Sequence, residues 1–148
     1  MVRSDIIQTR LATLADYLDL LKIRRNIPLT DLLADLREYH ATLYELQMAC
    51  QIVIDISSHI LLADFSRRAD RYRDVILGLG SEGVLPSDFA QRIAGVAGFR
   101  NILIHEYLTV DPQRVYQMLQ TGLDDLAKFS EYVSVYLLPT DSSLNFAL

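Results

Sequence analysis

Apolar residues recur at every third or fourth position along most of the chain, the spacing that one face of an α-helix brings into line. The first apolar stripe consists of Ile7, Leu11, Leu14, Leu18 and Leu21. Pro28 follows this stripe, and a proline stops a helix because it lacks a backbone N–H and its ring clashes with the preceding turn. The pattern therefore predicts a first helix within residues 1–27.

A long second helix is predicted from Pro28 or Thr30 to about Leu62. Its apolar stripe consists of Leu32, Leu36, Tyr39, Leu43, Leu46, Cys50, Val53, Ile54 and Ile60 or Leu61. A polar stripe also follows this helix in steps of four residues: Gln47, Gln51, Asp55 and His59. Stripes of opposite character indicate one face in the core and one facing water, a cleft or a partner. Asp55 and His59 are therefore candidates to line a cleft, although a histidine on such a helix is usually hydrogen-bonded within the fold.

The second half of the chain predicts three further helices. A short one carries Tyr72, Val75, Ile76 and Leu79 on its inner face, and glycines 78, 80 and 83 mark its end. The next begins at Pro86 or Ser87 and ends near Tyr107, and the last begins at Asp111-Pro112 and ends at Pro139. No segment alternates with a period of two. We therefore expect a single all-α domain over residues 1–148, a bundle of four main helices plus a short fifth, with a flexible tail from residue 139.

Composition and charge narrow the class of protein. Half of the residues are hydrophobic and 22% are charged, which is typical of a globular chain. The net charge of −5 argues against broad, non-specific binding of polyanions but leaves room for a small, locally basic site. Arg67, Arg68, Arg71 and Arg73 form one basic cluster and Arg24 with Arg25 another. Each cluster is either a solvated helix end or part of such a site.

The cysteine content and the amino terminus indicate the compartment. Cys50 is the only cysteine, so an intramolecular disulfide is impossible, and its apolar surroundings predict a buried side chain in a reducing compartment. The first ten residues lack the apolar core of a signal peptide. No uninterrupted apolar run approaches the roughly 18 residues of a membrane helix. We expect a cytoplasmic protein that does not contact a membrane.

The octet RNILIHEY, residues 100–107, places Arg100, His105 and Tyr107 close together near the end of a predicted helix. The apolar stripe of this helix, Phe89, Ile93 and Val96, continues onto Arg100 and Leu103. A buried guanidinium needs an acidic partner or a polar cleft, because burying an unpaired charge is very costly. A second face carries the small residues Ala94, Ala97 and Gly98, then Asn101 and His105. This face predicts a close approach by a helix, a second subunit or a substrate.

These residue types suit cleavage of RNA without a metal. A histidine titrates near neutral pH, so it can remove the proton of a ribose 2′-hydroxyl or protonate the leaving oxygen. An arginine can stabilise charge on the phosphate oxygens, and a phenol can position the phosphate. Arg100 and His105 are five residues apart, about 140° around an ideal helix, so they converge only if the helix ends near His105 or two copies face each other.

Spacing alone favours a structural alternative, because a single Arg–His pair is a weak motif. In this alternative Arg100 pairs with Asp55 or Glu106, His105 is a hydrogen-bonded residue at a helix end, and Tyr107 belongs to the core. A metal site is not expected in either case. The three histidines have no ligand spacing and the chain has no cysteine pair.

Three segments carry a resemblance to a known family: LPSDFAQRIAGVAGFRNILIHEYLTVDPQRVYQML, ELQMACQIVIDISSHIL and RYRDVI. Together they resemble the HepT-like branch of the HEPN superfamily over roughly residues 43–136. The resemblance implies a helical bundle that forms a homodimer with the motif helices near the two-fold axis. It also implies a metal-independent RNA endonuclease, without a cofactor, that acts as the toxin of a toxin–antitoxin pair. Gly98 is a mild departure, because this position is often large or basic in such sequences.

The resemblance also assigns roles to single residues and a partner. Arg100 and His105 are expected to be catalytic, while Asn101 is a common residue within the motif. The expected antitoxin is a separate, minimal MNT-type nucleotidyltransferase that transfers AMP from ATP to Tyr107. A phosphate and a nucleotide beside Arg100 and His105 would block RNA. The alternative function is a non-catalytic module that binds a nucleotidyltransferase or a nucleotide, which the acidic net charge favours.

Overall fold

The computed structural model describes residues 3–139, and the predicted tail beyond Pro139 lies outside this range. No strand occurs in the described range, as expected for an all-α chain. The elements are α1 (Ser4–Arg25), α2 (Leu29–Ala34), α3 (Leu36–Phe65), α4 (Tyr72–Ser81), α5 (Ser87–Ile93), α6 (Gly95–His105), α7 (Pro112–Gln117), the π-helical turn η1 (Met118–Gly122) and α8 (Leu123–Tyr136).

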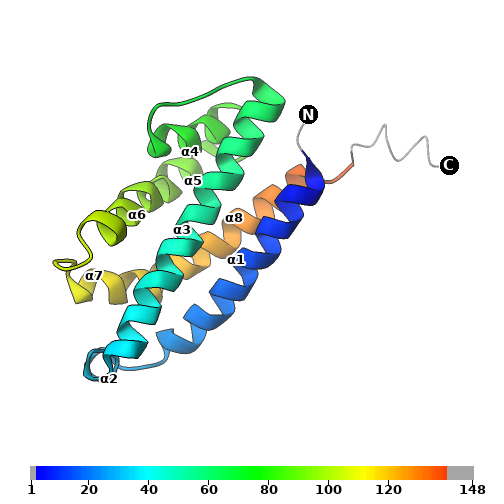
Figure 1. Cartoon of the computed structure of the whole chain (residues 1–148). Helices are drawn as coiled ribbons and strands as arrows, with labels where there is room; N and C mark the ends of the chain where they lie inside the picture. Colours follow the sequence, from blue (N-terminus) through cyan, green and yellow to red (C-terminus); the bar gives the residue numbers. More distant parts are fainter. Residues whose placement is uncertain (1–2, 140–148) are drawn as a thin grey trace.

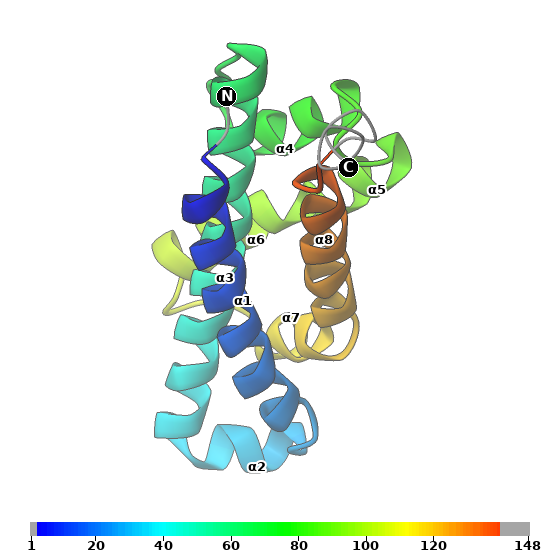
Figure 2. The same ribbon diagram turned by 90° about the vertical axis from the view of Figure 1, so that its right-hand side faces the viewer.

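The helix α3 is the centre of the bundle. It packs against α1, α4, α6 and α8. Figure 1 shows α1 running beside α3, with α4, α5 and α6 on the opposite side of α3. In Figure 2, α8 stands to the right of the α1–α3 pair and α2 closes one end of the bundle. The four-helix plan is therefore α1, α3, the α5–α6 segment and the α7–α8 segment, with α4 as the short addition.

The first helix forms as its apolar stripe predicts. All five residues of that stripe are buried in α1. The helix ends at Arg25 and is capped by Asn26, and Pro28 then adopts the extended conformation that precedes α2. The amino-terminal part of the bundle thus follows directly from sequence periodicity.

The predicted long helix is broken at Asp35, so α2 and α3 are separate helices. Asp35 has an extended backbone (φ −117°, ψ 100°), and its carboxylate accepts a hydrogen bond from the backbone N–H of Arg37 at 3.0 Å. An aspartate in this position satisfies one of the free N–H groups at the start of a helix. As a result, Leu36 is not part of the core stripe and is 61% exposed.

Among the described helices, α3 alone has the length and apolar content to cross a membrane. Polar residues interrupt its sequence, which is why a search for an uninterrupted apolar run misses it. Of its most apolar window, 56% is buried inside the bundle. Cys50 lies in this buried part, and burial raises the pKa of its thiol to about 12. The apolar side chains of α3 therefore form the protein core, and Cys50 is an unreactive part of it.

The two carboxyl-terminal helices also depart from the predicted continuous form. Ala94 separates α5 from α6, and its carbonyl accepts a tight-turn hydrogen bond from Ala97 N–H at 3.2 Å. The last helix contains the π turn η1, where a Cβ added at Gly122 would overlap the side chain of Met118. Buried residues at 115, 119 and 123 are four apart. Four residues of an ideal α-helix turn about 40° more than one full turn, so side chains four apart drift around the helix. The wider π turn reduces this drift and keeps the three side chains on one face.

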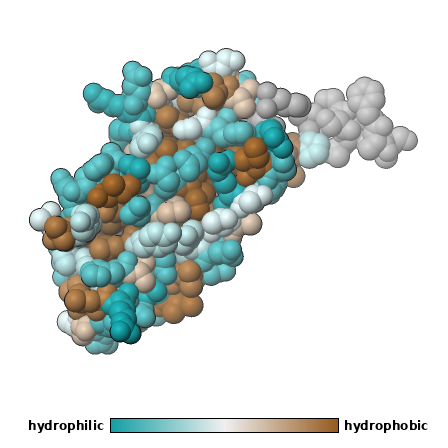
Figure 3. All heavy atoms as spheres, viewed as in Figure 1, coloured by the Kyte–Doolittle hydropathy of each residue, from teal (hydrophilic) through white to brown (hydrophobic). Residues whose placement is uncertain are grey.

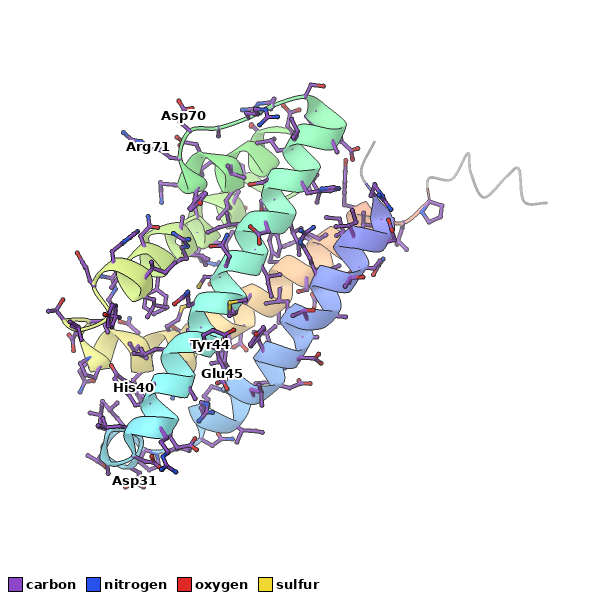
Figure 4. All side chains as sticks on the ribbon, in the orientation of Figure 1. Asp31, His40, Tyr44, Glu45, Asp70 and Arg71 are labelled. Carbon is purple, nitrogen blue, oxygen red and sulfur yellow. The ribbon has the colours of Figure 1, made fainter. Side chains whose placement is uncertain are left out.

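An ion cluster joins the end of α1 to the beginning of α3. Arg24 Nε donates to Glu45 Oε2 at 2.6 Å, and its Nη1 contacts Glu38. Glu45 is only 6% exposed and lies on α3 facing α1, as the label in Figure 4 shows. Arg25 contacts Asp124 of α8 at 3.5 Å. Both arginines of this cluster are therefore paired with carboxylates and join α1 to α3 and α8.

Candidate functional site

The carboxyl-terminal half of α6 borders an open hollow of about 690 Å³, which we call the arginine hollow. It is lined by Asp70, Arg71, Tyr72, Arg73, Ala94, Gly95, Ala97, Gly98, Arg100, Asn101, His105 and Arg114. The helix α6 ends at His105, and Glu106 is already outside it. Arg100, Asn101 and His105 thus face one space although their spacing would separate the first and last on an ideal helix.

Neutral partners hold the guanidinium of Arg100. Its Nε donates to Gln51 Oε1 at 2.7 Å and its Nη1 donates to Asn101 Oδ1 at 2.9 Å. The guanidinium also lies over the ring of Tyr72, with 5.1 Å between Cζ and the ring centroid. No ion pair with Asp55, Glu106 or another carboxylate occurs among the described residues. The positive charge of Arg100 therefore remains available to an anion in the hollow.

Gln51 connects Arg100 to Asp55. The amide of Gln51 donates from Nε2 to Asp55 Oδ1 at 2.8 Å while its oxygen accepts from Arg100. The Asp55 carboxylate can only accept, so it binds the amide nitrogen of Gln51. The amide oxygen is then turned toward the guanidinium of Arg100, which can only donate. Asp55 is not among the residues that line the hollow and acts one residue away from it. Gln51 was visible in the polar stripe of the sequence, but its contact with Arg100 was not.

The buried stripe of α6 passes through Phe99 and not through Arg100. Val96, Phe99 and Leu103 are 7%, 5% and 3% exposed, whereas Arg100 is half-buried at the edge of the core. The break at Ala94 shifts the register that Phe89 and Ile93 establish on α5. A Cβ added at Gly98 would have no atom of the chain within 4 Å. The face that carries Gly98, Asn101 and His105 is thus open to another molecule, and nothing in the described chain approaches Gly98.

His105 and Tyr107 lie on different surfaces. The His105 side chain is exposed and has no hydrogen-bond partner among the described residues. Tyr107 is 59% exposed, so it is not a core phenol, and it lines a second hollow of about 860 Å³ between α3 and the segment after α6. Because α6 ends at His105, the expected catalytic residue His105 and the expected modification site Tyr107 line different hollows.

His59 lies away from both hollows. Its Nε2 accepts a hydrogen bond from the backbone N–H of Arg3 at 3.3 Å, at the beginning of α1. It does not line the arginine hollow, so the structure places this candidate in the contact between α1 and α3. Tyr72 was expected to face inward, but it is 42% exposed beneath Arg100.

The arginines of the second basic cluster have two kinds of surroundings: Arg67 is paired within the fold, and Arg71 and Arg73 line the arginine hollow. Arg67 donates to Ser81 Oγ at 3.1 Å and pairs with Glu82 at 2.8 Å. Arg71 and Arg73 line the arginine hollow, and Figure 4 labels Arg71 beside Asp70 in the segment that leads into α4. Arg114 of α7 completes the positive lining from the other side of α6. No cluster of three or more potential metal-ligating His, Cys, Asp or Glu residues occurs in the described part of the chain.

Comparison of the sequence with protein families gives a match over most of the chain. The model of the family described as ribonuclease HepT-like matches residues 8–133. A tRNA nuclease HepT of Aphanizomenon flos-aquae is 34% identical over 133 residues, which are 90% of each chain. An mRNA nuclease HepT of Shewanella oneidensis is 24% identical over 93 residues, 63% of this chain and 70% of the relative.

Solved structures share the fold at lower sequence identity. A tri-AMPylated HEPN toxin of Shewanella oneidensis, solved in complex with an MNT antitoxin, superposes with a TM-score of 0.81 at 21% identity, covering 90% of this chain and 99% of that one. The protein YutE of Bacillus subtilis, described as a cytosolic protein of unknown function, gives 0.78 at 19% identity over 92% and 91%. The extent of the family match and the 34% identity are decisive: the chain belongs to the ribonuclease HepT-like family and is a ribonuclease with the all-α HEPN fold.

Proposed function

We propose that this ribonuclease is the metal-independent endoribonuclease toxin of a toxin–antitoxin pair. Arg100 and His105 carry the cleavage, and Tyr107 is the residue to which a separate MNT-type nucleotidyltransferase transfers AMP. One observation carries the proposal: a guanidinium without an acidic partner and an exposed imidazole share the arginine hollow. The names of the relatives, a tRNA nuclease and an mRNA nuclease, support RNA as the substrate.

The chemistry needs one base, one anion-binding group and a water-accessible leaving oxygen. His105 removes the proton of the ribose 2′-hydroxyl, the 2′-oxygen bonds to phosphorus, and the bond from phosphorus to the 5′-oxygen breaks. The leaving oxygen takes a proton from water, to which the hollow is open. Arg100 donates to the non-bridging phosphate oxygens, where negative charge grows during the reaction. The products are a 2′,3′-cyclic phosphate and a 5′-hydroxyl.

The remaining arginines suit the flanking phosphates of a single RNA strand. Four arginines and one aspartate line the hollow, a local excess of three positive charges in a chain of net charge −5. Arginine forms paired hydrogen bonds with phosphate oxygens. A strand that crosses the hollow would place Arg71 and Arg73 on one side of the cleaved phosphate and Arg114 on the other.

A homodimer is part of the proposal. The exposed face of α6 carries Gly95 and Gly98, and a Cβ at either position would meet nothing of this chain within 4 Å. Small residues permit close approach of a second helix, and a symmetric pair would bring two arginine hollows together. The alternative expected from the acidic net charge, a binding module without nuclease activity, does not agree with membership of the ribonuclease family.

Purified, unmodified protein tests these functions directly. We expect it to cleave single-stranded RNA at an unchanged rate after dialysis against EDTA, leaving 2′,3′-cyclic phosphate ends that mass spectrometry identifies. A magnesium-dependent nuclease in the same buffer serves as the control and should lose activity. Cleavage that EDTA stops would contradict the metal-independent mechanism, and intact single-stranded RNA would contradict the proposed substrate.

The role of Gln51 gives a second expected result. The substitution Gln51→Leu keeps the side-chain volume but removes the acceptor of Arg100 Nε, so we expect kcat/KM to fall about 10-fold, the effect of losing one charged hydrogen bond. Gln51→Glu keeps an acceptor but neutralises the guanidinium, so it should mainly raise KM for RNA. Steady-state kinetics separate the two effects. Wild-type kinetics for both variants would show that Gln51 does not position Arg100.

A further inference from the structure

A third hollow, of about 350 Å³, lies at the carboxyl end of α3. It is bordered by that end of the helix and by the segment 66–71 that leads into α4, and we call it the loop hollow. Figure 4 labels Asp70 in this segment, and Figure 3 shows, in the same orientation, hydrophilic residues projecting from this corner of the molecule. Asp70 also lines the arginine hollow, so the two hollows adjoin. The lining of the loop hollow includes Leu61, Leu62, Arg67, Arg68, Asp70 and Val75.

The segment that borders the loop hollow is anchored to both neighbouring helices. Ser66 ends α3 in the left-handed conformation (φ 53°), and the backbone N–H of Arg67 donates to the carbonyl of Leu61 at 3.1 Å. The side chain of Arg67 reaches the end of α4, where it donates to Ser81 and pairs with Glu82 at 2.8 Å. The charge of Arg67 is therefore already balanced within the fold.

Arg68 has no such partner. Its side chain is exposed and forms no ion pair or hydrogen bond with any described residue, and the same holds for Arg71 and Arg73 in the adjoining arginine hollow. Apart from Arg67, the two linings together hold five arginines and one acidic residue, Asp70, in a chain of net charge −5. Unpaired positive charge therefore continues from the arginine hollow into the loop hollow.

The rest of the lining is mostly apolar. Leu61 and Val75 are buried, while Leu62 is 43% exposed and offers a hydrocarbon surface in the same hollow as the guanidinium of Arg68. A nucleotide has the same two kinds of surface, a base with an apolar face and an anionic phosphate. Single-stranded nucleic acid is bound by positive grooves with surfaces on which bases lie, and arginine also stacks on bases. The volume of the hollow is at the lower end of the range for small-ligand sites.

We propose that the loop hollow is a distal subsite for the RNA strand, which holds one unstacked nucleotide away from the cleaved position. Arg68 binds the phosphate of this nucleotide, and the base lies against Leu62. The subsite rests on the proposed function, because the same strand passes through the arginine hollow. The carboxylate of Asp70 repels phosphate at the junction, so the phosphates lie at Arg71 and Arg68, on either side of it. The preferred substrate is thus a single-stranded end or loop, whose bases are free to unstack.

The length of the substrate separates the subsite from the cleavage site. Wild type and Arg68→Ala are compared, as unmodified full-length proteins, on a single-stranded RNA of roughly ten nucleotides and on a dinucleotide, which is too short to reach beyond the arginine hollow. We expect Arg68→Ala to lower kcat/KM for the longer strand about 10-fold, mainly through KM, the effect of losing one charged hydrogen bond. Cleavage of the dinucleotide and Tm should not change, because Arg68 has no partner within the described fold.

Arg37→Ala is the matched control. The Arg37 side chain is also exposed and unpaired among the described residues, and it lies in the first turn of α3, roughly 40 Å along the helix from the loop hollow. Its loss changes the net charge by the same amount, so we expect wild-type cleavage of both substrates. Equal kcat/KM of Arg68→Ala and Arg37→Ala on the longer strand would overturn the proposal.

The salt dependence of binding gives a readout that a purely structural role of Arg68 would not change. Fluorescence anisotropy measures the affinity of the longer strand for His105→Ala protein, which is expected to bind the strand without cleaving it. Adding Arg68→Ala should reduce the slope of log affinity against log salt by about 0.7, the contribution of one phosphate contact in a single strand. Arg68→Lys should restore the slope, because a lysine keeps the charge. An unchanged slope in Arg68→Ala would overturn the proposal.

The remaining outcomes distinguish the subsite from the proposed function. If Arg68→Ala binds RNA as wild type does but loses affinity for an added nucleotidyltransferase, the loop hollow is a protein-docking surface and the proposal is overturned. If His105→Ala cleaves at the wild-type rate while Arg68→Ala keeps its length-dependent effect, the proposed mechanism fails and the subsite stands.

Discussion

Replacing His105 with alanine is expected to reduce the rate of RNA cleavage by about 10²- to 10⁴-fold, the range that a single general acid–base group contributes. The side chain is exposed at the last residue of α6 and has no partner among the described residues. Its removal should therefore change the free energy of unfolding by no more than about 0.5 kcal/mol. Single-turnover cleavage of RNA measures the first effect and thermal unfolding measures the second.

His59→Ala is the matched control for this experiment. His59 accepts a hydrogen bond from the backbone of Arg3 and does not line either hollow, so its loss should leave cleavage intact. The same pair of variants can be compared in cells, where His105→Ala should abolish growth inhibition and His59→Ala should retain it. A His105→Ala protein that cleaves at more than a tenth of the wild-type rate would remove His105 from the mechanism.

The second large effect is expected at Arg100. Arg100→Ala removes the group that stabilises charge on the phosphate, and we expect kcat to fall about 10²- to 10³-fold, as on loss of one oxyanion donor. Arg100→Lys should recover only part of this loss. A lysine retains the charge, but it cannot donate to Gln51 Oε1 and present a planar pair of N–H groups to the phosphate at the same time.

Kinetics of both Arg100 variants, with Arg67→Ala beside them, make the test specific. Arg67 pairs with Glu82 outside the arginine hollow, so its removal tests a change of charge alone. We expect Arg67→Ala to cleave RNA at close to the wild-type rate. Wild-type activity in Arg100→Lys would show that the charge of Arg100 matters and its geometry does not.

Helices were predictable from the sequence wherever one apolar stripe serves one helix, as in α1. The stripe drawn from Leu32 through Leu36 assumed a continuous helix, and the break at Asp35 left Leu36 61% exposed. The local signal was present, since Asp35 precedes Glu38 by three residues, a spacing typical of a helix start. The break at Ala94 has no such signal, because both of its neighbours remain helical and only the register changes.

The candidate site was predictable only in part, for a reason of scale. The polar stripe runs over the 12 residue steps from Gln47 to His59, or roughly 18 Å of helix, which is too long for one cleft. Its residues contact three different parts of the molecule. Gln47 lines the hollow beside Tyr107, and Gln51 accepts from Arg100 while it donates to Asp55. His59 accepts from the backbone at the start of α1. Arg100 and Gln51 are 49 positions apart, and periodicity cannot report a contact across that distance.

The contrast between the arginine hollow and the rest of the molecule has a consequence for how RNA reaches the enzyme. The net negative charge of the chain repels an approaching strand, although salt screens this repulsion beyond a Debye length of about 8–10 Å, and the four arginines of the hollow attract the strand at close range. Added salt then has two opposed effects, because it screens the distant repulsion and also competes for the phosphate contacts. The rate of encounter should therefore pass through a maximum at intermediate ionic strength.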